Sequence, residues 1–193
     1  MVVASAEIHR WTREEYERMA AKGFFPPDAR VELIEGIVYD TTPQSSFHST
    51  SVYMLHERLR AVFTEGVIVR NQSPLVLGED SEPEPDLAVV PGSAEDYLFA
   101  HPTTAVLVVE VADSSLLRDR RLKIPLYARA GVPEAWLLNL KRTVLEAYRD
   151  PAEGVYRSRT VLRPGESVSP LARPDVSLAV GDFFPWERSA RKP

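Results

Sequence analysis

Two apolar runs in the middle of the chain predict the centre of a β-sheet. Residues 87–90 read Leu-Ala-Val-Val, and residues 105–111 read Ala-Val-Leu-Val-Val-Glu-Val. Both runs are short and rich in β-branched residues, which is typical of strands that are buried on both faces. Asp86 directly precedes the first run, and Glu110 interrupts the second. Because a carboxylate is rarely buried without a partner, we expect these two acidic residues to share one.

Capping residues predict helices over residues 12–22 and within 113–130, and apolar residues at helical spacing predict a helix over residues 45–63. The first helix begins with Thr12 and Glu15 at the spacing of a capping box. The second helix carries His48 at the head of its buried stripe. In the third helix, Pro125 removes a backbone hydrogen bond, so this helix either kinks there or begins close to Lys123.

Shorter runs predict the remaining strands, over residues 30–34, 37–39, 67–71, 74–77, 134–140, 143–149 and 155–162. Glu35 and Gly36 suit a tight hairpin turn, because glycine adopts a positive φ easily. A second hairpin is predicted around residues 151–154. The fold class is therefore α/β, with a mixed β-sheet flanked by helices and additional β-hairpins. Neighbouring central strands would place Asp86 and Glu110 side by side.

The size and composition limit the kind of protein. A chain of 193 residues fits a single domain over residues 1–193, which would bury roughly 70% of its unfolded surface. No apolar run approaches the ~20 residues that span a bilayer, and the first residues do not read as a signal peptide. We therefore expect a cytoplasmic protein without a membrane partner. Cysteine is absent, so any metal would be held by oxygen or histidine ligands.

Charge is distributed unevenly along the chain, whose net charge is −5. Residues 1–100 carry 8 Lys and Arg against 17 Asp and Glu, whereas residues 101–193 carry 15 against 11. The net charge argues against a protein that coats nucleic acid non-specifically, but the basic second half is suited to a polyanion such as DNA. The alternative is a solvated surface on which the uneven distribution of charge arose by chance and has no function.

Asp86, Glu110 and Lys123 together suggest phosphoryl chemistry. A Mg²⁺ or Mn²⁺ ion needs only one or two protein carboxylates, with waters and substrate oxygens as its other ligands. Such an ion activates water and neutralises charge on a phosphoryl group, while an ammonium stabilises the transition state. Hydrolysis of a phosphodiester uses all three groups. The competing interpretation is a buried ion pair between Glu110 and Lys123 that binds nothing.

Several motifs occur in a fixed order along the chain: the hairpin at residues 31–36, His48, Pro85-Asp86, Val109-Glu110-Val111, Asp119, Lys123, Tyr127-Ala-Arg-Ala-Gly-Val132 and Glu134-Ala-Trp136. Each motif alone is weak. Their order over nearly the whole chain resembles the Uma-two family of restriction-type endonucleases, within the PD-(D/E)XK nuclease superfamily.

This resemblance implies a restriction-endonuclease-like core and metal-dependent cleavage of DNA. It implies catalytic roles for Asp86, Glu110 and Lys123. Glu32 would approach the metal directly or through a water, unless it is only a surface residue of its strand. The side chains of Asp86 and Glu110 would hold Mg²⁺ or Mn²⁺, with the backbone carbonyl of Val111 as a further ligand.

One position departs from the superfamily pattern. The lysine of the superfamily normally lies two residues after the strand carboxylate, where this chain has Ala112. In the resembled family the lysine comes from the following helix, which matches Lys123. This assignment depends on where the helix near Pro125 begins.

Other functions and roles stay open at this stage. A glycosidase would use the two carboxylates without a metal or a lysine. A catalytically silent module that binds nucleic acid or another partner would keep the fold without the reaction. His48 would orient a group or contact a phosphate, or it is simply a hydrogen-bonded histidine at a helix start. Cutting both DNA strands needs two copies of a one-site domain, so we also expect a homodimer.

Overall fold

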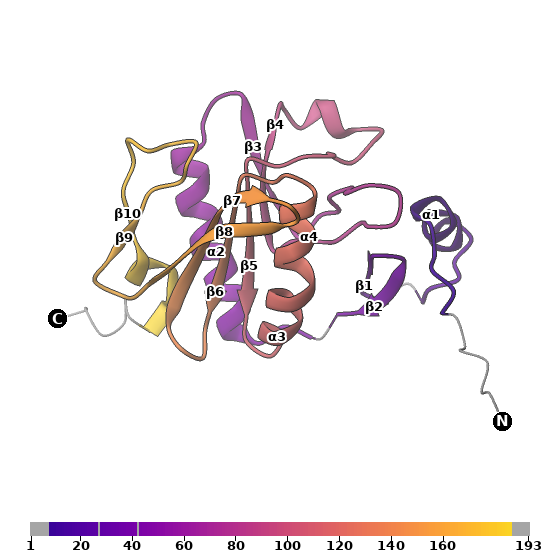
Figure 1. The fold of residues 1–193 in the computed structure, drawn as a ribbon, viewed down its shortest axis with the longest axis horizontal. Helices are drawn as coiled ribbons and strands as arrows, with labels where there is room; N and C mark the ends of the chain where they lie inside the picture. Colours follow the sequence, from indigo (N-terminus) through magenta and orange to yellow (C-terminus); the bar gives the residue numbers. More distant parts are fainter. Residues whose placement is uncertain (1–7, 27, 42, 187–193) are drawn as a thin grey trace.

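A six-stranded mixed β-sheet forms the centre of the computed structural model, which describes residues 8–26, 28–41 and 43–186 (Figure 1). Its strands, in spatial order, are β3 (Val67–Asn71), β4 (Leu87–Pro91), β5 (Leu107–Ala112), β6 (Glu134–Asn139), β7 (Val144–Ala152) and β8 (Val155–Leu162). Strands β5 and β6 run parallel, and the other neighbours are antiparallel. The predicted α/β class with a mixed sheet is therefore confirmed.

Helices cover both faces of this sheet. The long helix α2 (Ser46–Val62) lies on one face with the short η3 (Val180–Phe183), and α4 (Ile124–Arg129) lies on the other (Figure 1). Alternate residues of each strand enter the two cores, since neighbouring side chains on a strand point to opposite faces. Thus Val109 and Val111 pack on the α2 side, whereas Val108 and Ala112 pack on the α4 side. The position of Glu110 in this alternation directs its side chain towards α4.

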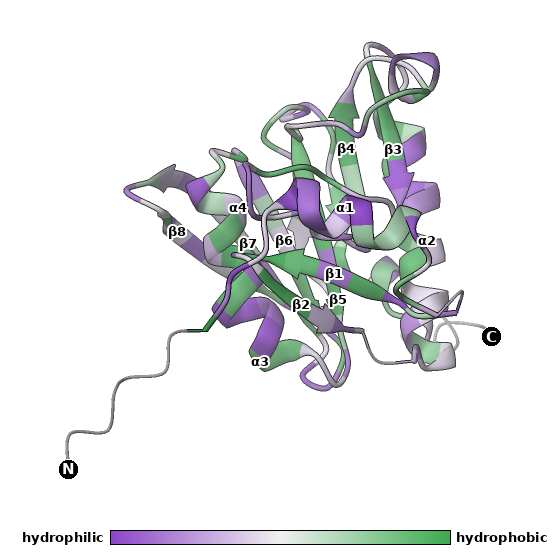
Figure 2. Cartoon of the chain, turned by 90° about the vertical axis from the view of Figure 1, so that its right-hand side faces the viewer, coloured by the Kyte–Doolittle hydropathy of each residue, from purple (hydrophilic) through white to green (hydrophobic). Residues whose placement is uncertain are grey.

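The N-terminal elements lie over the α4 side of the sheet. Helix α1 (Arg13–Ala21) begins with the predicted capping box of Thr12 and Glu15. Strands β1 (Val31–Ile34) and β2 (Ile37–Asp40) form the predicted hairpin, in which Gly36 has a φ of 76°. Figure 2 shows α1, β1 and β2 in front of the sheet. An isolated bridge between Leu33 and Glu82 ties the hairpin to the chain that precedes β4.

One predicted strand is wrong. Residues 74–77 form no strand in the structure. Leu75 and Leu77 donate their backbone N–H groups to Pro83 and Ser81, so the segment folds back on its own loop instead of pairing with the sheet. The side chains of both leucines are buried, which explains why the pattern looked strand-like.

The segment between β5 and α4 is built from three short pieces. A single α turn, α3 (Leu116–Arg118), leads into the π-helix η2 (Asp119–Lys123) and then into α4. Pro125 lies in the first turn of α4, where its missing N–H costs little. The segment α4 thus begins next to Lys123, as the second predicted alternative expects, but it continues the helical backbone of α3 and η2 without a break. π-helical turns are frequent at functional sites.

The remaining elements lie at the ends and edges of the sheet. Strands β7 and β8 form the second predicted hairpin. Two small strands, β9 (Ser167–Val168) and β10 (Leu178–Ala179), pair before η3, and η1 (Glu95–Tyr97) is a 3₁₀ turn after β4. Within the described residues, no helix combines the length and apolarity needed to cross a membrane.

Glu82→Gln is expected to stabilise the protein in a pH-dependent way. Burial, followed by the nearby charge of Glu17, raises the pKa of Glu82 from 4.5 to about 7. The folded wild type therefore loses stability as the pH rises from about 4.5 to about 7, because the unfolded chain gives up the proton first. Glutamine imitates the protonated form, so thermal unfolding should show a gain of about 1–2 kcal/mol at pH 8 and little gain at pH 4. A gain that does not depend on pH would contradict this explanation.

Candidate active site

The two carboxylates that the sequence singles out line one cleft, which is described below. Strands β4 and β5 are antiparallel neighbours, with Leu87 opposite Val109. Asp86 directly precedes β4, and Glu110 lies near the end of β5. The antiparallel pairing of these strands therefore brings the two acidic residues to the same end of the sheet.

Asp86 is a buried, fully hydrogen-bonded carboxylate. Its Oδ2 accepts the backbone N–H of Val111 at 2.8 Å and lies 3.2 Å from Nε2 of His48. Its Oδ1 accepts a hydrogen bond from Gln72 at 3.1 Å. Burial alone would raise the pKa of Asp86, but the contacts with His48 and Val111 outweigh it, so the pKa is lowered. Asp86 therefore stays ionised.

His48 is placed by the start of α2. Ser45 caps this helix by accepting the backbone N–H of His48 at 3.2 Å. Burial alone would lower the pKa of His48, but the hydrogen bond to Asp86 outweighs it and the pKa is raised. His48 is thus a hydrogen-bonded histidine at a helix start, as one possibility from the sequence had it, and its contact with Asp86 also suits the orienting role.

The pKa of Glu110 is shifted in the opposite direction to the pKa of Asp86. Its Oε1 lies 3.2 Å from Nζ of Lys123 and accepts the hydroxyl of Tyr127. Burial raises the pKa of Glu110 to about 8, although the positive charge of Lys123 opposes this shift. A second positive charge near this carboxylate would stabilise its ionised form.

Lys123 bridges two buried carboxylates. Its Nζ lies 2.8 Å from Oε2 of Glu32 and 3.2 Å from Oε1 of Glu110, and it donates to the backbone carbonyl of Glu84 at 3.4 Å. Burial alone would lower the pKa of Lys123, but Glu110 and Glu32 outweigh it and raise the pKa. The side chain is only 3% exposed. Lys123 is therefore a buried ammonium that reaches the site from η2.

Glu32 is not a surface residue of its strand, which was one of the two possibilities that the sequence left open. It is fully buried, and its Oε2 also accepts the backbone N–H of Glu84 at 3.2 Å. It does not line the cleft described below. In this arrangement Glu32 acts on the site by holding Lys123.

Asp119 is a site residue to which the sequence reasoning gave no role. It lies on η2, one turn before Lys123, and it is buried. Ser115 donates a hydrogen bond to it, and Arg118 lies 3.8 Å away. Burial raises the pKa of Asp119, against the positive charge of Lys123. One feature of the sequence could have indicated a role for Asp119. It lies four residues before Lys123, a spacing that places an acid and a lysine on one helical face.

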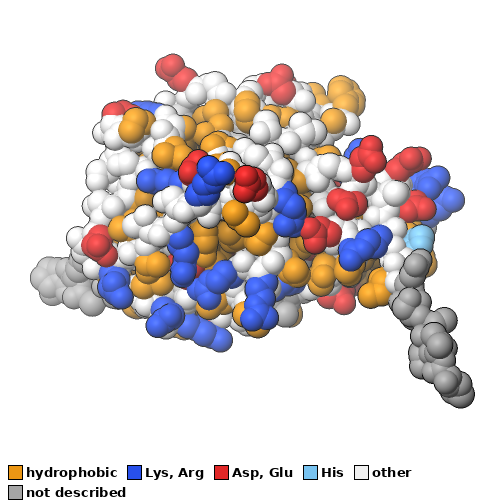
Figure 3. Space-filling model, viewed as in Figure 1, with side chains coloured by type: hydrophobic (Ala, Val, Ile, Leu, Met, Phe, Trp, Pro, Cys, Tyr) orange, Lys and Arg blue, Asp and Glu red, His pale blue; other side chains and the backbone are white. Residues whose placement is uncertain are grey.

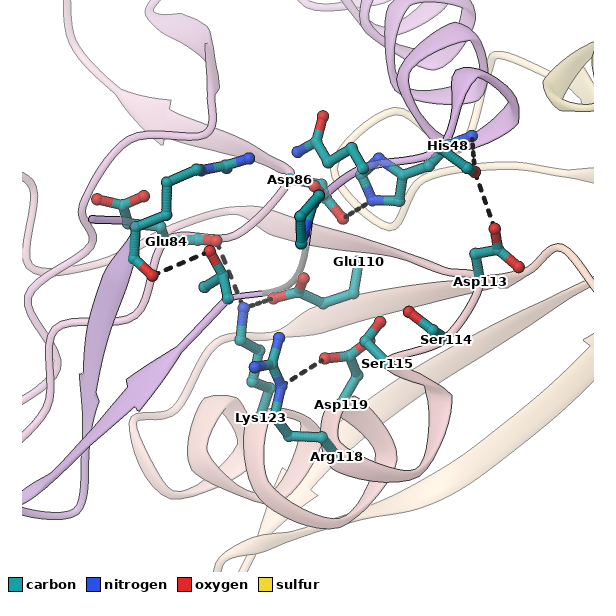
Figure 4. A pocket seen from close by; sticks show the side chains of 15 residues that line it. His48, Glu84, Asp86, Glu110, Asp113, Ser114, Ser115, Arg118, Asp119 and Lys123 are labelled. Carbon is teal, nitrogen blue, oxygen red and sulfur yellow. Dashed lines mark hydrogen bonds and ion pairs between the residues drawn. The ribbon is translucent and has the colours of Figure 1, made fainter. Parts of the chain in front are cut away.

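These side chains surround a small cleft with a volume of about 100 Å³ (Figure 4). Asp86, Glu110, Asp119 and Lys123 line it, together with Asp113. A space of this size holds several waters, at roughly 10–15 Å³ for each. Carboxylates outnumber cations around the cleft, which favours the binding of a further cation.

The donors fit a hard divalent cation with few protein ligands. Among the residues that the structure describes, no group of three or more His, Cys, Asp or Glu side chains forms a ready metal site. A Mg²⁺ ion, however, needs only one or two carboxylates and keeps several waters. Asp86 and Glu110 meet that requirement, and a cation beside them would offset the burial that raises the pKa of Glu110. The carbonyl of Val111 as a ligand remains a prediction.

Comparisons with known proteins identify the family and the fold of this chain. A family model described as "Uma2: Putative restriction endonuclease" matches residues 13–186. The chain belongs to this family. A solved structure described as a "putative nuclease belonging to DUF820", from Anabaena variabilis ATCC 29413, superposes with a TM-score of 0.70 at 16% sequence identity. The match covers 91% of this chain and 98% of that one, so the two share a fold. No curated protein matches the sequence.

Proposed function

We propose that this chain is a metal-dependent endonuclease that hydrolyses phosphodiester bonds of DNA with Mg²⁺ or Mn²⁺. The observation that carries the proposal is the convergence of Asp86, Glu110 and Lys123 on one small cleft. The membership of the restriction endonuclease family supports it. A glycosidase gains nothing from an ammonium buried between two carboxylates.

Different residues of the chain would have different roles in the proposed reaction. Asp86 and Glu110 would hold the cation, which supplies an activated water and neutralises charge on the scissile phosphate. His48 and Val111 keep Asp86 ionised and fixed in orientation. Lys123 presents a positive charge that stabilises negative charge on a phosphoryl oxygen. Glu32 fixes the position of this ammonium.

Basic side chains beside the cleft suit a DNA backbone. Arg30 and Arg118 line the cleft itself, and Arg121 follows on η2, whereas the guanidinium of Arg120 is paired with Glu146. Figure 3 shows lysine and arginine side chains gathered over the lower part of the face that carries α3 and β8. Contacts of this kind bind phosphates without reading the base sequence. We expect a homodimer when both strands of a duplex are cut.

A catalytically silent nucleic-acid-binding module is the second candidate. It is favoured by one observation, which is that Glu32 and Glu110 already pair with the ammonium of Lys123. In that module the cluster would serve stability alone.

Nicking of supercoiled plasmid in Mg²⁺ or Mn²⁺ separates these functions. The wild type should convert supercoiled to open-circular DNA, and EDTA should stop it. Asp86→Asn should lower the rate by roughly 10²-fold or more, because a neutral amide replaces an ionised ligand. Wild-type binding to DNA without any nicking would favour the silent module. Equal nicking by wild type and Asp86→Asn would point to a contaminating nuclease and refute the assignment of Asp86.

A further inference from the structure

An apolar recess opens beside the carboxylate cleft. Its volume is about 320 Å³, which falls within the roughly 300–1,000 Å³ of small-ligand sites. Phe47, Leu140 and Trp186 line it, together with Lys141, Thr143 and Asp113. None of the roles assigned to the carboxylate cleft uses this recess.

The aromatic rings of Phe47 and Trp186 form an apolar wall of the recess. Phe47, in the first turn of α2, is 58% exposed. Its ring lies edge-on to Trp186, with the centroids 5.7 Å apart. Trp186 in turn packs on the buried Phe184 at 5.4 Å. The tryptophan is thus anchored in the core, while the phenylalanine stands free on one side.

The recess adjoins the cleft. Asp113 lines both spaces, and it accepts a hydrogen bond from Ser45 at 2.8 Å. Ser45 caps the helix that carries Phe47 and His48 as consecutive residues. Phe47 therefore lines the recess, while His48 contacts Asp86. A DNA strand that entered the cleft would therefore pass Asp113, which also borders the recess.

We propose that the recess binds an unstacked nucleobase of the DNA strand whose phosphate lies in the carboxylate cleft. This inference rests on the proposed function and adds a substrate class to it. A base offers a flat apolar face to the rings of Phe47 and Trp186, and such stacking tolerates any base. Lys141 is exposed at the recess and is complementary in charge to the phosphate of the same nucleotide.

The shape of the recess favours this occupant over a second copy of the chain. A stable interface between proteins buries about 1,000 Å² or more, whereas this recess has the volume of a site for one small group. A base in an intact duplex is stacked and paired, so it must be extruded at a cost before it enters. The enzyme should therefore prefer single-stranded or frayed DNA to an intact duplex.

Binding of a single-stranded oligonucleotide that carries the fluorescent base 2-aminopurine tests the proposal. The experiment is run with Mg²⁺ present, because the carboxylates of the cleft would otherwise repel the phosphate, and the fluorescence is read before cleavage has proceeded. Stacking on the wild-type rings should quench the fluorescence. Phe47→Ala should lose the quenching and weaken binding about tenfold or more, the scale of one lost base–aromatic stack. The matched control is Tyr53→Ala, which removes a 64% exposed aromatic residue from the same helix and should behave as the wild type.

The possible results separate this inference from the proposed function. Equal quenching and binding by Phe47→Ala and the wild type would overturn the base site, even if plasmid nicking is intact. A wild type that nicks plasmid but leaves 2-aminopurine unquenched would do the same. If Phe47→Ala instead converts a dimer to a monomer in sedimentation, the recess belongs to self-association. Quenching that depends on Phe47 in a protein that nicks nothing would support the base site and refute the nuclease.

Discussion

Lys123→Ala is expected to lower the rate of DNA cleavage by roughly 10²-fold or more, the effect of losing one electrostatic stabiliser of the transition state. The variant should also lose about 3–5 kcal/mol of unfolding free energy, because it leaves the buried carboxylates of Glu32 and Glu110 without their cation. With 3% exposure and two ion pairs, Lys123 is placed to support the fold as well as the proposed reaction.

A double variant separates the loss of catalysis from the loss of stability. Glu32→Gln combined with Lys123→Ala removes one negative charge together with the positive charge, so part of the stability should return. Cleavage should not return, since no ammonium reaches the cleft. Lys123→Arg should restore little of the rate, because a planar guanidinium does not replace a compact ammonium. Plasmid nicking and thermal unfolding, measured on all three variants, provide the check. Cleavage that recovers together with stability would show that Lys123 serves the fold alone.

The sheet could be predicted because its signals are local. The runs at residues 87–90 and 105–111 are apolar enough for central strands, and Thr12 with Glu15 marks a helix start without reference to the rest of the chain. The strand predicted over residues 74–77 was wrong, because a short apolar run is compatible with a buried loop as well as with a strand. Only the pairing of its backbone groups with the chain around residues 81–83 decides between the two.

The centre of the site could be predicted, but its supporting contacts could not. Asp86 and Glu110 stood out because a carboxylate is rarely buried without a partner. The burial of Glu32 depends on a hairpin that folds over the sheet from a distant part of the chain, and a strand of four residues does not reveal which face is covered. The recess at Phe47 depends on Trp186, which lies 139 positions further along the chain. Local patterns carry no information about such contacts.

Metal binding is expected to weaken steeply as the pH falls below about 8. At that pH Glu110 is half protonated, because burial raises its pKa to about 8. A cation that binds this carboxylate must displace the proton, so its affinity should fall by up to about tenfold for each pH unit below 8 and level off above it. Between pH 8 and pH 6 the loss approaches roughly 10²-fold. Calorimetry with Mn²⁺ in buffers of different ionisation enthalpy measures both the affinity and the number of protons released.

Two variants make this last expectation specific to Glu110. Glu110→Gln should remove both most of the affinity and the release of a proton, since the amide has no proton to exchange at these pH values. Asp119→Asn is the matched control, because Asp119 is also buried and also has a raised pKa but is not assigned as a ligand. It should leave the proton release near pH 7 in place. If Asp119→Asn abolishes the release and Glu110→Gln does not, the titrating ligand is Asp119, and the cation lies closer to η2 than to β5.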